Sequence, residues 1–311
     1  MRIIFFGKAD RGASCLRAFM GSGIAVDAVA VQGGADPCAA IARQHGIDLL
    51  EIDDPNAPAT LEALRARKPD LFVLAGYGKI LKPEIIAVPS RMTINLHAGK
   101  LPECRGSSPL NWALIHGWPE FSLSVIAVDA GVDSGDILLS RSFPIAPRAT
   151  ICDLHATANQ QFPEMLVEVV RRLMGGSLVR TPQDKARSAY YPLRFSEDGA
   201  ILWDMLTAEQ IDRRVRALTA PYPCAFTLFK GRRVKLLAAE PSERPFYGEP
   251  GRIYRIAPQG LLVCASDKSL WITEAVFEDD GTPLRGTVKR YECLATVREA
   301  ALRLLQGSAA P

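Results

Sequence analysis

The side chains best suited to chemistry in this chain are an amide, an imidazole and a carboxylate, at Asn95, His97 and Asp133. The run Met92-Thr93-Ile94-Asn95-Leu96-His97 is β-branched and apolar until Ala98-Gly99, which predicts a buried strand that ends at the edge of a sheet. Because side chains two apart on a strand point to the same side, we expect Asn95 and His97 to leave the strand end together. Ligands bind at this carboxyl end in open parallel sheets.

These three groups would support attack by an amine on a carbonyl. The Asn95 amide can donate to an oxygen that becomes negative, and the His97 imidazole can donate to it or exchange a proton with the amine. A carboxylate beside the ring would fix its tautomer and raise its basicity, and Asp133 in the turn Asp129–Gly135 is the candidate. A single histidine at a strand end is more often structural than catalytic, so the downstream motifs decide between the two interpretations.

Two segments of the chain resemble the 10-formyltetrahydrofolate-dependent formyltransferases. They are NLHAGKLPECRGSSPLNWALIHG (Asn95 to Gly117) and DAGVDSGDIL (Asp129 to Leu138), and a likeness extends from Arg2 to about Thr273. The resemblance implies a triad of Asn95, His97 and Asp133, with 10-formyltetrahydrofolate as co-substrate. In the implied reaction an unprotonated amine attacks the formyl carbon, Asn95 and His97 stabilise the oxyanion, and His97 with Asp133 passes the amine proton toward the departing folate nitrogen.

The resemblance also implies which loops hold the ligands. Similar proteins bind the pterin with backbone after the strand 71–75 and before the catalytic Asp; the expected cofactor-binding residues here are Gly76, Tyr77, Gly78, Ile80, Gly131 and Asp136. Amides at a helix start, with an arginine, can bind an anion, so the expected substrate-binding residues are Lys8, Arg105, Gly106, Ser107 and Pro109. Two alternatives stay open: the glycines serve only a turn, and Arg105 only pairs with an acidic neighbour.

The wider pattern predicts an α/β fold with a second domain. Continuous apolar runs alternate with helix-periodic segments; the strands are expected at 3–6, 26–31, 71–75 and 92–97, and the helices at 13–20, 38–45, 61–68 behind a Thr60 cap, 109–116 and 150–174. We expect a Rossmann-like open, mostly parallel sheet. A polar segment over 183–197 follows, then a helix near 208–218 and short apolar runs separated by turns, typical of a small β-barrel.

The resemblance implies that this second domain is an OB-like β-barrel. The predicted domains are therefore a catalytic domain over 1–190, a linker over 191–205 and the C-terminal domain over 206–311.

Composition excludes several classes of protein. The 311 residues are 48% hydrophobic, which is ordinary for a globular chain, and no apolar stretch approaches a signal peptide or the roughly 20 residues of a membrane span. The seven cysteines include no C-x-x-C pair, which argues for a reducing cytoplasm and against a metal site, and we interpret Cys104 as a lining residue. The segment Gly7–Gly12 lacks G-x-G-x-x-G spacing, which argues against a nicotinamide cofactor.

The identity of the amine is the open part of the sequence interpretation. Leu110-Asn111-Trp112 is similar to the sugar N-formyltransferases, so the preferred substrate is a nucleotide-linked amino sugar. The runner-up is methionyl-tRNA, whose formyltransferase carries a long basic loop; the corresponding stretch 31–37 here has no Arg or Lys. From Ile201 onward, 16 Lys or Arg stand against 13 Asp or Glu, whereas a tRNA-binding protein usually shows a strong basic face.

Further alternatives are a small amine such as hydroxyornithine, a deformylase, and a non-catalytic folate- or nucleotide-binding module. A deformylase would usually carry an additional N-terminal domain, and a binding module would not need all three of Asn95, His97 and Asp133. The sequence leaves open whether the protein is a monomer or a homodimer.

Overall fold

The computed structural model describes residues 1–298, which form two compact units. The first comprises Met1–Pro109, Glu120–Ile145 and Leu154–Pro192, and the second Leu110–Pro119, Ala146–Asp153 and the chain from Leu193. The segments 110–119 and 146–153 therefore group with the C-terminal part of the chain, which the sequence did not indicate. The domain boundaries at 190 and 206 stay a prediction, and residues 299–311 of the expected C-terminal domain lie outside the described residues.

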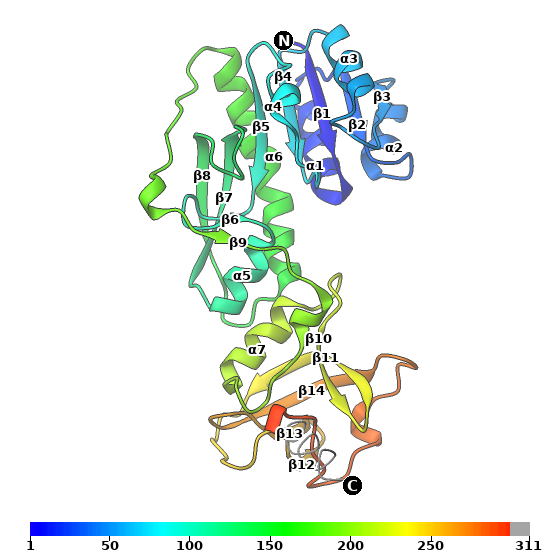
Figure 1. Cartoon of the computed structure of the whole chain (residues 1–311), viewed down its shortest axis with the longest axis vertical. Helices are drawn as coiled ribbons and strands as arrows, with labels where there is room; N and C mark the ends of the chain where they lie inside the picture. The colour runs from blue at the N-terminus through cyan, green and yellow to red at the C-terminus, as the bar shows by residue number, and fades with distance from the viewer. Residues whose placement is uncertain (299–311) are drawn as a thin grey trace, which may run out of the picture. The chain divides into compact units, whose positions relative to one another are not determined.

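A seven-stranded sheet forms the first unit (Figure 1). Its strands in spatial order are β3 (Asp48–Glu51), β2 (Ala28–Val31), β1 (Ile3–Gly7), β4 (Leu71–Ala75), β5 (Met92–His97), β7 (Glu120–Ala127) and β8 (Ile137–Pro144). The first five strands pair parallel, whereas β7 pairs antiparallel with both β5 and β8. The expected open, mostly parallel sheet is confirmed.

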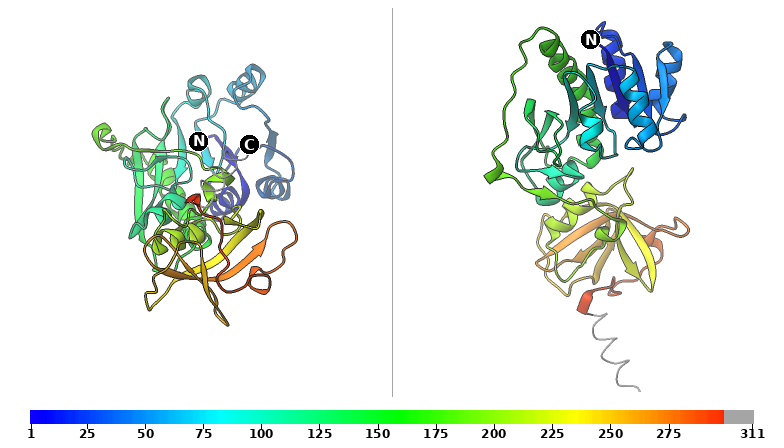
Figure 2. Two further views of the ribbon diagram at one scale, coloured as in Figure 1. Left: turned by 60° about the horizontal axis from the view of Figure 1, so that its bottom comes forward. Right: turned by 45° about the horizontal axis from the view of Figure 1, so that its top comes forward.

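The apolar run of β1 is continuous because both of its faces are covered (Figure 2). On one face Phe5 packs edge to face against Phe19 of α1 (Ala9–Gly21), with ring centroids 5.8 Å apart. On the other face Phe6 packs against Phe72 at 5.1 Å, in a buried cluster that includes Leu64 of α3 (Pro58–Ala66). Burial on both sides fixes the register of this strand and therefore the position of its carboxyl end at Gly7.

Five helices accompany this sheet. They are α1 (Ala9–Gly21), α2 (Pro37–Gln44), α3 (Pro58–Ala66), α4 (Pro83–Ile86) and α6 (Ile151–Met174), whereas α5 (Pro109–His116) groups mainly with the second unit. The expected cap at Thr60 is wrong: Ala57 is the N-cap residue, Pro58 starts the helix, and the Thr60 hydroxyl donates to the Asp54 carbonyl at 2.9 Å. Proline suits the first helical position because no N–H is needed there, which moves the helix start toward the N-terminus.

A five-stranded antiparallel sheet forms the second unit. Its strands in spatial order are β10 (Ala225–Phe229), β11 (Arg232–Pro241), β14 (Ser269–Phe277), β13 (Gly260–Cys264) and β12 (Ile253–Ala257). The helix α7 (Ala208–Ala217) precedes it, capped by Thr207 and Gln210. Trp203 is fully buried, and its indole N–H donates to the Thr227 hydroxyl at 2.9 Å. The expected C-terminal antiparallel domain is confirmed, and its sheet is consistent with a small barrel.

The polar segment after α6 stays in the first unit as far as Pro192, before the chain enters the second unit. Its strand β9 (Tyr190–Tyr191) pairs parallel with β6 (Arg105–Gly106), a strand that follows the Asn95 motif. The short helices η1 (Lys185–Arg187) and η2 (Ser196–Gly199) lie on either side of β9. The segment expected to be only a connection therefore contributes to the candidate site.

Among the helices described over residues 1–298, none combines the length and the apolar composition needed to cross a membrane.

Candidate active site

Asn95 and His97 stand at the carboxyl end of β5, as the sequence predicts. The strand is paired on both sides: Asn95 lies opposite Leu74 of β4, and His97 lies opposite Ser124 of β7. The Asn95 side chain is half-buried, and its amide makes no hydrogen bond to any of the described residues. A rigid central strand thus presents an amide whose donors are available to a ligand.

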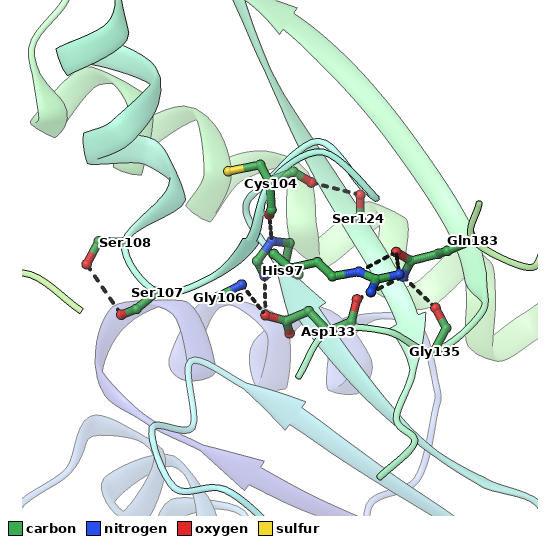
Figure 3. Close-up of polar contacts among 11 residues, drawn as sticks. His97, Cys104, Gly106, Ser107, Ser108, Ser124, Asp133, Gly135 and Gln183 are labelled. Carbon is green, nitrogen blue, oxygen red and sulfur yellow. Dashed lines mark hydrogen bonds and ion pairs between the residues drawn. The ribbon is translucent and has the colours of Figure 1, made fainter. Parts of the chain in front are cut away.

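The His97 ring is buried between two oxygen atoms (Figure 3). Its Nδ1 lies 3.4 Å from Asp133 Oδ2, and its Nε2 lies 2.6 Å from the carbonyl oxygen of Cys104. Because a carbonyl oxygen only accepts, Nε2 carries a proton in this arrangement. The expected convergence of His97 and Asp133, which are 36 positions apart in the chain, is confirmed.

Gly99 allows the chain to turn close behind this ring. A Cβ at position 99 would lie 2.4 Å from His97 Nε2 and 2.6 Å from the Cys104 carbonyl oxygen, closer than atoms can approach. The Ala98-Gly99 step therefore ends the strand and also leaves room for the imidazole. The Gly99 carbonyl accepts a hydrogen bond from Ser124 of β7 at 3.1 Å, which fixes the turn.

Asp133 adopts a left-handed backbone conformation, with φ of 49°. Such a conformation costs a non-glycine residue about 1–2 kcal/mol, so surrounding contacts must hold it. Its carboxylate Oδ2 accepts a hydrogen bond from the Gly106 amide of β6 at 2.9 Å. The same oxygen faces the imidazole, so Gly106 aims the carboxylate at the ring.

The sequence did not predict a second layer of contacts around Asp133. Gln183 donates from Nε2 to the carbonyl oxygens of Asp133 at 2.9 Å and of Gly135 at 2.7 Å. Its Oε1 accepts two hydrogen bonds from Arg105, at 3.0 and 2.8 Å, and Arg105 also donates to the Tyr190 hydroxyl at 2.9 Å. No local pattern marks Gln183, because its role depends on residues about 50 and 78 positions away.

The residues expected to form an anion site at the start of α5 already have partners within the protein. The Arg105 guanidinium belongs to a residue only 3% exposed, and it has no acidic partner among the described residues. The Gly106 amide bonds to Asp133 and the Ser107 amide to the Tyr191 carbonyl at 2.9 Å, while Pro109, the first residue of α5, has no N–H. These donors hold the site together, and a contact between Arg105, Gly106, Ser107 or Pro109 and the substrate stays a prediction.

Lys8 is the remaining residue of the expected substrate set. It lies at the carboxyl end of β1, its side chain is exposed, and its Nζ lies 3.3 Å from Gln32 Oε1. A contact between Lys8 and the substrate stays a prediction.

The loop after β4 has the form of a tight turn with an exposed tip. Gly76 has φ of 72°, and a Cβ there would lie 2.9 Å from the Lys8 carbonyl oxygen, so glycine is required. Tyr77 is buried against Phe6, and burial, followed by the charge of Asp54, raises its pKa to about 12. Gly78 and Ile80 are exposed. Pterin binding by this loop stays a prediction.

The other expected folate contacts lie in the Asp133 turn. The Gly131 amide donates to Asp129 Oδ1 at 3.1 Å, and the Asp136 carboxylate pairs with Arg180 at 2.8 Å. Asp136 therefore uses its side chain to fix the turn. A folate contact by Gly131 or Asp136 stays a prediction.

Cys104 has no nucleophilic role in this arrangement. Its side chain is fully buried, and burial, followed by the nearby charge of Asp133, raises the pKa of the thiol to about 12. The thiolate is thus nearly absent at neutral pH, in agreement with its interpretation as a lining residue.

We expect a thiol reagent at neutral pH to modify the exposed Cys152 and to leave Cys104 unmodified. Peptide mass spectrometry after brief iodoacetamide treatment of the native protein would measure both, with unfolded protein as the control in which both react. Alkylation of Cys104 at a rate equal to that of Cys152 would contradict the described burial.

The fold brings an amide, an imidazole and a carboxylate together at the carboxyl end of β5, an arrangement suited to group transfer. The chain belongs to the formyl transferase family: the family model matches residues 1–170, and the model of the formyl transferase C-terminal domain matches residues 195–283. It is a folate-dependent formyltransferase with 10-formyltetrahydrofolate as co-substrate. The unpartnered Asn95 amide at the carboxyl edge fits a formyl oxygen as its acceptor.

Full-length relatives resolve part of the substrate question. A methionyl-tRNA formyltransferase of Geobacter sulfurreducens is 34% identical over 288 residues, 89% of this chain and 90% of the relative. A methionyl-tRNA formyltransferase of Citrifermentans bemidjiense is also 34% identical, over 89% of each chain. An N-formyltransferase of Helicobacter canadensis, solved with folinic acid and dTDP-3-aminofucose, has a TM-score of 0.67 but is 16% identical, over 86% of this chain and 97% of that chain.

These relatives overturn the preferred partner. The sequence was interpreted as favouring a nucleotide-linked amino sugar over tRNA, but the full-length relatives at 34% identity are named for methionyl-tRNA. The sugar enzyme shares the fold alone at its low identity. The three residues Leu110-Asn111-Trp112 were too short a signal, because they lie at the start of a helix that packs mainly within the protein.

Proposed function

We propose that this enzyme transfers the formyl group of 10-formyltetrahydrofolate to the amino group of methionyl-tRNA. The observation that carries the proposal is the 34% identity to methionyl-tRNA formyltransferases across about nine tenths of both chains. That match extends into the C-terminal unit. The short loop at 31–37 then means that other parts of this protein contact the tRNA.

A groove in the C-terminal unit supports an RNA acceptor. It has a volume of about 780 Å³, and its walls carry three arginines, two glutamates and two aromatic rings: Arg148, Arg244, Arg255, Glu240, Glu243, Phe246 and Trp271. Arg244 and Arg255 are exposed and have no acidic partner within residues 1–298. Guanidinium groups bind phosphates, and aromatic rings stack on unpaired bases. A C-terminal region with a net charge near zero can therefore still contain a local RNA-binding surface.

The roles of the site residues follow from their contacts. Asn95 donates to the formyl oxygen as negative charge develops there. The amine nitrogen bonds to the formyl carbon and the bond from that carbon to the folate nitrogen breaks. His97 passes the amine proton to the departing folate nitrogen, and Asp133 stabilises the charged ring through Nδ1. The N–H at His97 Nε2 already faces the Cys104 carbonyl oxygen. When substrate binds, this N–H either donates to the formyl oxygen in place of the carbonyl or is shared between the two oxygens.

An assay with matched amines tests the substrate. Purified protein with 10-formyltetrahydrofolate is expected to formylate methionyl-tRNA with a kcat/KM at least about a hundredfold above that for free methionine, since binding energy from the tRNA contributes to the rate. Uncharged tRNA controls for a reaction elsewhere on the nucleic acid. Equal transfer to free methionine, or none to methionyl-tRNA, would contradict the proposal.

A further inference from the structure

Gln183 connects two parts of the site that are far apart in the sequence. Its amide nitrogen donates both protons to the Asp133 turn, to the carbonyl oxygens of residues 133 and 135. Its amide oxygen accepts two hydrogen bonds from the buried Arg105. All four contacts lie within hydrogen-bonding distance, between 2.7 and 3.0 Å, so every polar atom of this side chain has a partner.

The contacts of Gln183, Arg105 and Gly106 form a closed cycle that begins and ends at Asp133. Arg105 is followed in β6 by Gly106, whose amide donates to the Asp133 carboxylate. The carboxylate is therefore held from β6, and the backbone of the same residue is held by Gln183, which is itself held by Arg105. One anchor holds the carboxylate and the other holds the backbone, so together they fix both the position and the direction of Asp133.

Asp133 needs such support because of its backbone. Its φ of 49° is unfavourable for a non-glycine residue. Loss of the contacts from Gly106 or Gln183 would therefore let the turn relax to a more favourable backbone conformation. Its carboxylate lies 3.4 Å from His97 Nδ1, so a small displacement would break the contact. A misplacement of about 1 Å in a catalytic group can cost about a hundredfold in rate.

We infer that Gln183 is a positioning residue for formyl transfer, which acts by fixing the Asp133 turn so that the carboxylate faces His97. The inference rests on the catalytic role proposed for Asp133 but not on which amine is formylated. Arg105 has a related function: its buried charge, with Gln183 and Tyr190 as its polar partners, orients the Gln183 amide so that the nitrogen faces the turn.

The substitution Gln183→Glu separates this role from a structural one. A glutamate keeps two acceptor oxygens for Arg105 and forms a charge-assisted pair, so the buried arginine stays satisfied. It loses both donors and sets an oxygen against the carbonyl oxygens of Asp133 and Gly135. If Gln183 served only to satisfy Arg105, the glutamate variant would be fully active.

We expect Gln183→Glu to lower kcat by about tenfold or more, with the KM for folate and for methionyl-tRNA changed by less than about twofold. Its melting temperature should not fall. Gln160→Glu, which adds the same charge on the exposed face of α6, is the matched control and should behave as the wild type. Wild-type kcat for Gln183→Glu would overturn the inference.

A second measurement does not depend on the amine. The chain contains four histidines, so ¹⁵N NMR of histidine-labelled protein can follow the His97 ring, assigned with a His97 variant. We expect Gln183→Glu to shift the Nδ1 signal in the direction that Asp133→Asn does, while Gln160→Glu does not. An unshifted signal would overturn the inference. Full activity of Asp133→Asn would instead refute the proposed catalytic role of Asp133.

Discussion

Replacing His97 is expected to abolish most of the activity while leaving a folded protein. The imidazole can act as a general acid and base toward the amine, and such proton transfer contributes about a hundredfold to ten-thousandfold to rate. His97→Ala should therefore lower kcat by about a thousandfold. Initial rates of formyl transfer, measured beside the melting temperature and the affinity for folate, would show this.

Because His97 is only 5% exposed, alanine also leaves a cavity, and a second variant removes that ambiguity. In His97→Gln the side chain keeps most of its volume and can donate to the Cys104 carbonyl, but it cannot transfer a proton. It should be about as slow as the alanine variant. His45→Ala changes an exposed histidine at the end of α2 and should retain wild-type rates. Activity of His97→Gln within about threefold of wild type would exclude proton transfer by His97.

Loss of the Asn95 amide should have the next largest effect. Removing one donor to a developing oxyanion typically costs about a hundredfold in kcat, and we expect this for Asn95→Ala. The amide makes no hydrogen bond to other residues within 1–298, so its removal leaves no buried group without a partner. The melting temperature should therefore change little, which distinguishes a catalytic loss from an unfolded protein.

Asn95→Asp tests the direction of the hydrogen bond. The aspartate is nearly the same size, but an ionised carboxylate only accepts and would repel the negative oxygen. Its kcat should be no higher than that of Asn95→Ala, with the folate affinity measured in both. If the aspartate variant kept most of the wild-type rate, Asn95 would act through its shape and not as a donor.

Much of the fold follows from local patterns in the sequence. The strands Leu71–Ala75 and Met92–His97 and the helix Pro109–His116 have the predicted bounds, because apolar periodicity and flanking glycine or proline are local properties of the chain. The strands β7 and β8 were not predicted. Residues along β8 alternate between partly covered and exposed, as in an edge strand with one open face, and such a strand gives a weak apolar signal.

The substrate shows the limit of counting charges. The nearly balanced charge from Ile201 onward favoured the prediction of an amino-sugar substrate over tRNA. The relatives that match most of the chain are instead named for methionyl-tRNA. The net charge counts two kinds of arginine alike. Arg232 pairs with Asp279 at 2.6 Å, whereas Arg255 has no acidic partner within residues 1–298. The free and paired arginines are distinguished only by their positions in the folded chain.

By itself the sequence predicted four of the five parallel strands, the two motifs and the three residues Asn95, His97 and Asp133. The tertiary structure alone revealed that Gln183 and Arg105 hold the turn of Asp133. It also showed that Arg105, which was expected to bind an anion, is buried. The physical reason is range: a strand or a turn is encoded by neighbours in the chain, while a hydrogen bond between residues 78 positions apart exists only after the whole unit has packed.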